Sequence, residues 1–261
     1  RTTREMLDDF SFLGEEKAYE LVVTNPNKIL DQVEEIEVII QTGGVPFSPR
    51  VKGDDGEYLD CPRVVTDLVY DKAKEWYGEP LPLNIEERIA KELYGDAVLN
   101  SIKYNLAKEN ITDIETIFKH LHETILKGFD EVKDLVRSNI KETTEEELDE
   151  KELEKKLKKT LGGIIGGGFD PIYLIAQKLV KKSNDDGFLV GSRGSVGSSF
   201  VATMMSITEV NPLPAHYRCL KCKHSIFDYE DGTPLGKDYS SGFDLPDKAC
   251  PRCGEAMYKD G

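Results

Sequence analysis

Four of the five cysteines of this chain form two Cys-x-x-Cys pairs near its C-terminal end. The pairs lie at 219–222 and 250–253, with 27 residues between them. Two residues between paired cysteines let both sulfurs of a tight turn point toward one ion, and two such turns complete a tetrahedral zinc site. A disulfide framework would instead be typical of a much smaller, secreted chain. The predicted zinc ligands are Cys219, Cys222, Cys250 and Cys253.

A zinc ion with four protein ligands has no open position for water, so the predicted ion is structural. Its expected role is to fold the C-terminal residues 216–261, which are too polar to form a core alone. His224 follows Cys222 by two residues and could replace a thiolate as a ligand. The fifth cysteine, Cys61, is expected to be an inert thiol.

The charge of the chain restricts the class of function. The sequence has 49 acidic and 34 basic residues, and its formal net charge is −15. This charge argues against a freestanding nucleic-acid-binding protein, because phosphate neutralisation needs clustered lysine and arginine. The stretch 171–200 is locally basic, with four basic and two acidic residues. The sequence has no apolar run near the roughly 18 residues of a membrane span and no signal pattern, which predicts a cytoplasmic protein without a membrane partner.

A glycine- and serine-rich loop at 191–199 separates two apolar segments. Residues 188–190 have the composition of a short buried strand, and residues 200–205 that of a buried helix. A strand, such a loop and a helix in this order aim backbone N–H groups at a phosphate, and Arg193 adds a charged fork. Flexible linkers share this composition, but they do not usually lie between two buried elements. The loop therefore predicts an anion site.

The elements that must position these sites are mainly helical. Helical spacing of apolar residues predicts a helix or helix pair from Thr3 to Asn25, with a break at Pro26, and a second helix that reaches Ile36. Capping boxes at Asn84 and Thr112 are expected to begin two further helices. Other helices are expected around 65–76 and along the acidic run 142–154, whose charges are typical of a solvated surface.

An amphipathic helix is expected to precede the 191–199 loop. Asp170 and Pro171 have the residue types of an N-cap and a first helical position, and residues 184–187 would end the helix. The glycine-rich segment 162–168 before it lacks the Gly-Lys-Ser/Thr ending of a P-loop and reads as a flexible helix end. The expected buried face of the helix consists of Ile172, Ile175, Ala176, Leu179 and Val180.

The residues around the loop resemble a known family. Residues 181–183 and 186–204, with Gly-Ser-Arg-Gly-Ser at 191–195, are similar to the palm domain of the PolC-type DNA polymerase III alpha subunit, the C-family replicase of Gram-positive bacteria. The similarity continues through 207–217, both cysteine pairs and 241–248, and the N-terminal residues 1–18 resemble the exit from that family's PHP domain. The sequence begins and ends as a piece of a longer chain would.

The resemblance implies an α+β fold: a beta-polymerase-like palm portion with a predominantly helical N-terminal half and a small zinc-knuckle module. The implied segments are PHP-exit helices and a connector at 1–60, the start of the palm at 61–94, a helical, acidic insertion at 95–160, a palm core with the phosphate loop at 161–215, and the four-cysteine zinc module at 216–261.

The activity implied by the resemblance is DNA-directed DNA synthesis, in which two Mg²⁺ ions held by aspartates assist nucleotidyl transfer. The implied partners are dNTP, primer-template DNA and, through regions outside these residues, replisome subunits such as the sliding clamp. The family's Pro-Asp-Ile-Asp motif does not occur here, so no catalytic residue is assigned and these residues alone are expected to be inactive. The resemblance places the incoming triphosphate at Ser192, Arg193, Gly194, Ser195, Ser198 and Ser199.

The competing interpretation is a non-catalytic module in which zinc and the glycine loop serve protein or DNA contacts. A different nucleotide-using enzyme would need its own base or nucleophile. His120 and His122 lie on a predicted helix without carboxylate or cysteine neighbours in a recognisable motif, and they are expected to be surface residues.

Overall fold

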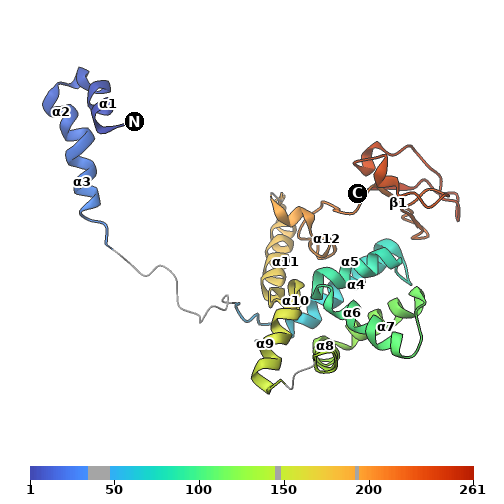
Figure 1. The fold of residues 1–261 in the computed structure, drawn as a ribbon. Helices are drawn as coiled ribbons and strands as arrows, with labels where there is room; N and C mark the ends of the chain where they lie inside the picture. Colours follow the sequence, from blue (N-terminus) through green and yellow to red (C-terminus); the bar gives the residue numbers. More distant parts are fainter. Residues whose placement is uncertain (35–47, 145–147, 192–193) are drawn as a thin grey trace. The chain divides into compact units, whose positions relative to one another are not determined.

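The structure is a computed structural model that describes residues 1–34, 48–144, 148–191 and 194–261 (Figure 1). Its contacts divide the chain into two units, Arg1–Phe47 and Ser48–Gly261, and each is described by itself. Within the described residues, no helix combines the length and the apolar composition that crossing a bilayer requires.

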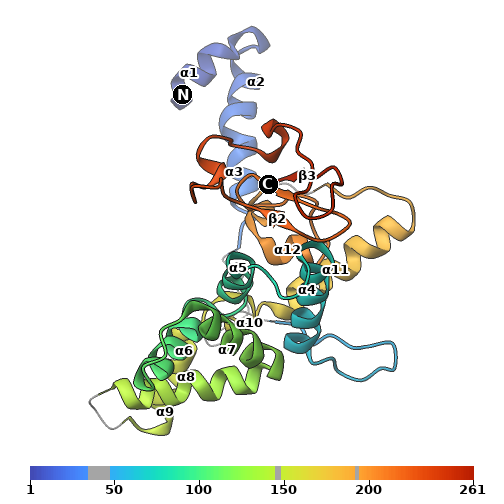
Figure 2. The same cartoon turned by 90° about the vertical axis from the view of Figure 1, so that its right-hand side faces the viewer.

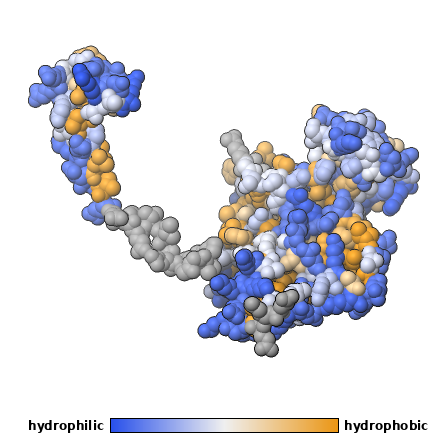
Figure 3. All heavy atoms as spheres, viewed as in Figure 1, coloured by the Kyte–Doolittle hydropathy of each residue, from blue (hydrophilic) through white to orange (hydrophobic). Residues whose placement is uncertain are grey.

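The first unit is a series of short helical segments. They are α1 (Thr3–Asp9), a 3-10 turn (Ser11–Leu13), α2 (Glu15–Tyr19), a π-helical turn (Glu20–Thr24) and α3 (Asn25–Leu30). A break was predicted at Pro26, but the chain stays helical there. The π-helical turn Glu20–Thr24 runs directly into α3, and Thr24 and Asn25 keep helical dihedral angles on the N-terminal side of Pro26. Ile36 lies outside the described residues. Ile29 and Leu30 of α3 are exposed, and orange patches of apolar residues lie among the blue ones on this unit's surface in Figure 3.

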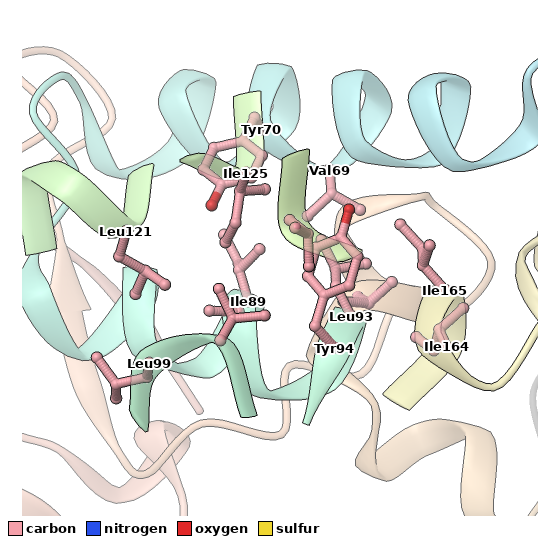
Figure 4. Packing of buried hydrophobic residues seen from close by; sticks show 14 of the residues in the cluster. Val69, Tyr70, Ile89, Leu93, Tyr94, Leu99, Leu121, Ile125, Ile164 and Ile165 are labelled. Carbon is pink, nitrogen blue, oxygen red and sulfur yellow. The ribbon is translucent and has the colours of Figure 1, made fainter. Parts of the chain in front are cut away.

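The second unit is built mainly of helices. They are α4 (Cys61–Tyr77), α5 (Leu83–Tyr94), α6 (Ala97–Lys108), α7 (Ile114–Lys127), α8 (Phe129–Thr143), α9 (Glu150–Thr160), α10 (Gly163–Gly166), α11 (Asp170–Asp185) and α12 (Phe200–Met204). Helix α5 is central, because it contacts α4, α6, α7, α10 and α12. Its residues Ile89 and Leu93 are fully buried among side chains of α4, α7 and α10 (Figure 4). The core therefore fixes the position of α5.

Two helix starts differ from the predicted capping boxes. Helix α5 begins at Leu83, one residue before the expected cap, and no side chain caps it. Helix α7 is capped by Asp113, whose carboxylate accepts a hydrogen bond from the Thr116 N–H at 2.8 Å. An aspartate can satisfy this N–H group as well as the neighbouring Thr112 could.

The acidic segment 95–160 shares the core of the second unit. Helices α6, α7 and α8 contact one another, α9 contacts α8, and Figure 2 shows the four helices grouped at one end of this unit. Helix α8 buries Val132, Val136 and Ile140, which recur every four residues, so an apolar stripe lies beneath its charged surface. Arg137 of α8 pairs with Glu150 and Glu154 of α9 across this surface.

A small antiparallel sheet forms the C-terminal part of the second unit. Its strands are β1 (His216–Arg218), β2 (Ser225–Ile226) and β3 (Tyr258–Asp260), in the order β2-β1-β3. Tyr217 pairs with Ile226 on one side and with Lys259 on the other. Together with the helices this sheet gives an α+β fold, as predicted.

The buried strand predicted at 188–190 is wrong. These residues are not assigned to a strand, and Phe188 and Leu189 are 69% and 97% exposed. Helix α11 forms over the expected span, but its N-cap is Phe169 and not Asp170, and Ile172 and Leu179 of its expected buried face are exposed. A strand requires a neighbour for its backbone groups, and the ladder of β1, β2 and β3 does not include 188–190. The apolar composition of 188–190 was therefore read as a sign of burial, whereas Phe188 and Leu189 are exposed within the described residues.

The glycine-rich segment 162–168 has a packing role where a flexible helix end was expected. Gly163 adopts φ +71°, and a Cβ there would meet the backbone of Glu92 and Leu93 at 2.6 Å. We expect Gly163→Ala to destabilise the chain by about 2 to 4 kcal/mol, because overpacking adds to the cost of a left-handed alanine. Gly168→Ala is the matched control, since it has a similar φ of +74° without a neighbour within 4 Å, and should cost only about 1 kcal/mol. Urea unfolding measures both, and equal losses would contradict the packing role.

Candidate functional site

The four paired cysteines lie together as one cluster. Their sulfur atoms are all within 4.8 Å of one another. The Cys219 and Cys253 sulfurs are 3.5 Å apart, as are those of Cys222 and Cys250. In a tetrahedral site with a Zn–S distance of about 2.3 Å the sulfurs lie about 3.8 Å apart. The geometry and the soft donor set therefore fit one metal ion of the size and preference of zinc.

The two halves of this cluster have the same backbone geometry. In the first, the Cys219 N–H donates to the His224 carbonyl at 2.8 Å and the Lys223 N–H donates to the Cys219 carbonyl. In the second, the Cys250 N–H donates to the Glu255 carbonyl at 2.7 Å and the Gly254 N–H donates to the Cys250 carbonyl. The fifth position of each turn has positive φ, 63° at Lys223 and 77° at Gly254. Each tight turn thus directs two sulfurs toward the centre of the cluster.

The same geometry favours the thiolate form of at least one ligand. The Cys222 N–H donates to the Cys219 sulfur at 3.4 Å, and this amide is the largest of several hydrogen bonds that together lower the pKa of the Cys219 thiol to about 6. Thiolate is the form that binds a metal ion. His224, the alternative ligand, is not a member of the cluster among the described residues, and it lines a cavity of about 720 Å³ instead.

The metal module is fixed to helix α4 by a buried polar contact. The Tyr77 hydroxyl of α4 lies 3.1 Å from His216 Nε2 and accepts a hydrogen bond from the Asn211 amide at 3.0 Å. Burial lowers the pKa of His216, which favours the neutral ring. Arg218 pairs with Asp260 at 2.6 Å and lies over the Trp76 ring. These contacts join the metal site to the helical core.

The predicted anion loop is described in part. Ser192 and Arg193 lie outside the described residues. Gly194 has φ +99°, and Ser195–Ser198 form a 3-10 turn that the Ser198 hydroxyl closes by donating to the Ser195 carbonyl at 2.6 Å. Ser199 is the N-cap of α12 and accepts a hydrogen bond from the Ala202 N–H at 3.1 Å. The described part of the loop is therefore an ordered turn that leads into a buried helix.

Two residues that the sequence analysis missed hold this loop. The Glu92 carboxylate of α5 accepts hydrogen bonds from the Ser199 hydroxyl and from the N–H groups of Phe200 and Val201, at 2.8 to 3.0 Å. Arg88 donates to Glu92 at 2.5 Å and to the Ser198 carbonyl at 2.8 Å. A cavity of about 450 Å³ borders both residues and Ser195, Ser198 and Ser199. The spacing of Arg88 and Glu92 signals only a helical ion pair.

His122 is not the isolated surface histidine that was expected. Its Nδ1 lies 3.1 Å from the carboxylate of Glu86, a residue that is 4% exposed and also accepts a hydrogen bond from the Tyr70 hydroxyl. The partner comes from α5, 36 positions earlier, so the local sequence around His122 gave no sign of it. The contact is a helix-to-helix tie between α5 and α7.

Comparisons with known proteins identify the family. A family model described as "Bacterial DNA polymerase III alpha NTPase domain" matches residues 130–228, which include the loop and the first cysteine pair. The chain is 41% identical to the DNA polymerase III PolC-type of Staphylococcus epidermidis, 42% to that of Halalkalibacterium halodurans and 40% to that of Bacillus subtilis.

Each of these matches extends over the whole chain, so it includes the acidic segment 95–160, and each spans 12% of the length of the relative. We conclude that this chain belongs to the PolC-type DNA polymerase III family.

Proposed function

We propose that this chain forms part of the palm of a replicative DNA polymerase and binds the triphosphate of the incoming dNTP. The proposed contacts come from Ser192, Arg193, Gly194, Ser195, Ser198 and Ser199. The single observation that supports this most is the ordered turn at Ser195–Ser198, which is tied to the core helix α5 and borders a cavity. A turn of this kind can present amides and hydroxyls to phosphate oxygens without further ordering.

The wider activity is proposed for the complete polymerase. It would extend a primer on a DNA template, with two Mg²⁺ ions held by aspartates outside these residues, and it would meet its sliding clamp through other regions. Magnesium ions would supply charge stabilisation of the transferring phosphoryl group. The four cysteines would hold zinc as a structural ion that folds 216–261.

The proposed roles within the loop differ in kind. The hydroxyls of Ser198 and Ser199 already donate to the Ser195 carbonyl and to Glu92, so a phosphate would receive them only by exchange of these bonds. Arg193 would supply a charge-assisted, two-pronged contact, which is the strongest kind of hydrogen bond to phosphate. Arg193 is therefore the proposed main contributor to affinity.

We expect Arg193→Ala in the complete polymerase to raise the KM for dNTP by roughly 10- to 100-fold, which corresponds to about 1.5 to 3 kcal/mol for one charge-assisted contact. Steady-state primer extension at varied dNTP concentration measures it. Lys181→Ala is the control, since it removes one positive charge from the same basic stretch where Lys181 pairs with Asp185 on the surface. An unchanged KM for the Arg193 variant would remove this residue from the site.

The alternative is a non-catalytic zinc module that binds DNA or protein. Titrations of labelled dNTP and of a short primer-template duplex against the protein separate the two. Saturable dNTP binding that the Arg193 variant loses supports the polymerase palm. Duplex binding without any dNTP binding supports the module.

A further inference from the structure

We propose that Arg88 and Glu92 are positioning residues, which hold the loop 194–199 in the one conformation that accepts the nucleotide triphosphate. The inference rests on the proposed function of that loop. It states that two side chains of α5, which is distant in the sequence, fix the conformation of the loop. We call this pair the α5 clamp.

Glu92 links the core helix to the start of α12. Its side chain is 15% exposed, and both carboxylate oxygens are used. Oε1 accepts the Phe200 N–H at 2.9 Å, and Oε2 accepts the Val201 N–H at 3.0 Å and the Ser199 hydroxyl at 2.8 Å. The N–H groups of a first helical turn lack partners within their own helix. Glu92 supplies these partners, so it fixes both the position and the direction of α12.

Arg88 links the same carboxylate to the loop itself. Its Nε donates to Glu92 Oε1 at 2.5 Å, and its Nη2 donates to the Ser198 carbonyl at 2.8 Å. The rigid guanidinium fork therefore sets the distance between the last carbonyl of the 3-10 turn and the carboxylate that holds α12. A lysine could keep the charge but could not hold both partners in this geometry.

The helix that carries the clamp is deeply packed in the core of the second unit. Ile89 and Leu93 each directly follow a clamp residue in the sequence, and both are fully buried. The backbone of Glu92 and Leu93 is also in close contact with Gly163. Hydrogen bonds between residues 107 to 110 positions apart in the sequence thus hold the loop against the core. A binding loop needs such support, because contacts that must be formed by ordering on binding cost affinity.

The clamp makes a prediction about which kinetic constant changes. Arg88 and Glu92 are already bonded to each other and to the loop, so they are assigned no contact with the nucleotide. Losing them should loosen the loop and raise the KM for dNTP by about tenfold or more, the scale found when residues that orient a ligand-binding group are lost. The affinity for primer-template DNA should stay within about twofold, since the loop is assigned to the nucleotide alone.

The experiment uses the complete polymerase and compares two arginines, each of which bridges a carboxylate and a backbone carbonyl. Arg88→Lys and Glu92→Gln test the clamp. Arg63→Lys and Asp67→Asn are the matched controls, because Arg63 Nε binds Asp67 at 2.9 Å, four residues on, and Arg63 Nη1 binds the Leu126 carbonyl at 2.7 Å. For each variant the KM for dNTP, the kcat, the dissociation constant for primer-template DNA and the melting temperature are measured.

The expected result is a raised KM for dNTP in the two clamp variants and not in the two controls, at comparable losses of melting temperature. The more conservative Glu92→Gln keeps one acceptor oxygen and should be milder than Glu92→Ala. The clamp is overturned if its variants keep the wild-type KM, or if the controls raise it equally.

These outcomes are separate from a failure of the proposed function. If Arg193→Ala raises the KM and the clamp variants do not, only the clamp is wrong. If the clamp variants raise the KM and Arg193→Ala does not, the loop keeps its role and Arg193 loses its own. If neither set changes the KM, both proposals fall.

Discussion

Replacing Cys219 by serine is expected to release the zinc ion and unfold residues 216–261, while helices α4 to α8 stay folded. Structural zinc contributes an apparent free energy of about 10 to 16 kcal/mol in small domains, and this energy is folding energy. The module has a small apolar core of its own, whose buried residues are Ala215, Tyr217, Cys219, Leu235, Leu245, Cys250 and Met257.

Limited proteolysis with mass spectrometry and a colorimetric zinc assay measure this result. Cys61→Ser is the control, because Cys61 is equally a buried thiol but lies outside the cluster, so this variant should keep one zinc per chain and an unchanged digestion pattern. A strong chelator should reproduce the effect of Cys219→Ser on the wild-type chain. If residues 216–261 keep their protease resistance after metal removal, zinc has no structural role here.

The cysteine cluster could be predicted because its information is local. Each pair supplies two ligands within four residues, so the spacing alone specifies the chemistry. Apolar periodicity is local in the same way: it predicted the helices around 65–76 and after Asn84 and Thr112, and their residues Val69, Ile89 and Leu121 are buried.

The α5 clamp could not be predicted, because its meaning depends on a long-range contact. Arg88 and Glu92 are four residues apart on a helix, and so are Arg63 and Asp67. From the sequence alone, the two pairs cannot be told apart, because each is an arginine followed four residues later by an acidic residue. Only the fold brings Ser199 to one of them across 107 residues.

The error at 188–190 has a different cause. Apolar composition measures how much a segment gains when it is covered, and it does not say what covers it. Phe188 and Leu189 have the residue types of a buried strand but are exposed in the described residues. The prediction thus failed because composition does not identify a neighbouring strand for 188–190, and not because these residue types disfavour a strand.

Replacing Asp260 by alanine is expected to cost about 3 to 5 kcal/mol, because it leaves the Arg218 guanidinium buried without its partner. The side chains of Arg218 and Asp260 are 8% and 12% exposed, and their atoms are 2.6 Å apart. Arg218 also lies over the rings of Trp76 and Tyr258, at 4.0 and 4.9 Å. An ion in such a site has lost most of its water, so the carboxylate is its main compensation.

Asp247→Ala is the matched control for Asp260→Ala. It also breaks an ion pair between an aspartate and a basic residue in the same module. Asp247 is 99% exposed and pairs with Lys259 at 3.1 Å, so its loss should cost less than about 1 kcal/mol. The measurement is urea unfolding followed by the fluorescence of Trp76, the single tryptophan of the chain, which lies against Arg218. If both variants unfold at the same urea concentration, the buried pair contributes no more than a surface pair. A larger loss for Asp260→Ala would show that the buried pair, which joins β1 and β3 beside Trp76 of α4, contributes more to stability than the surface pair does.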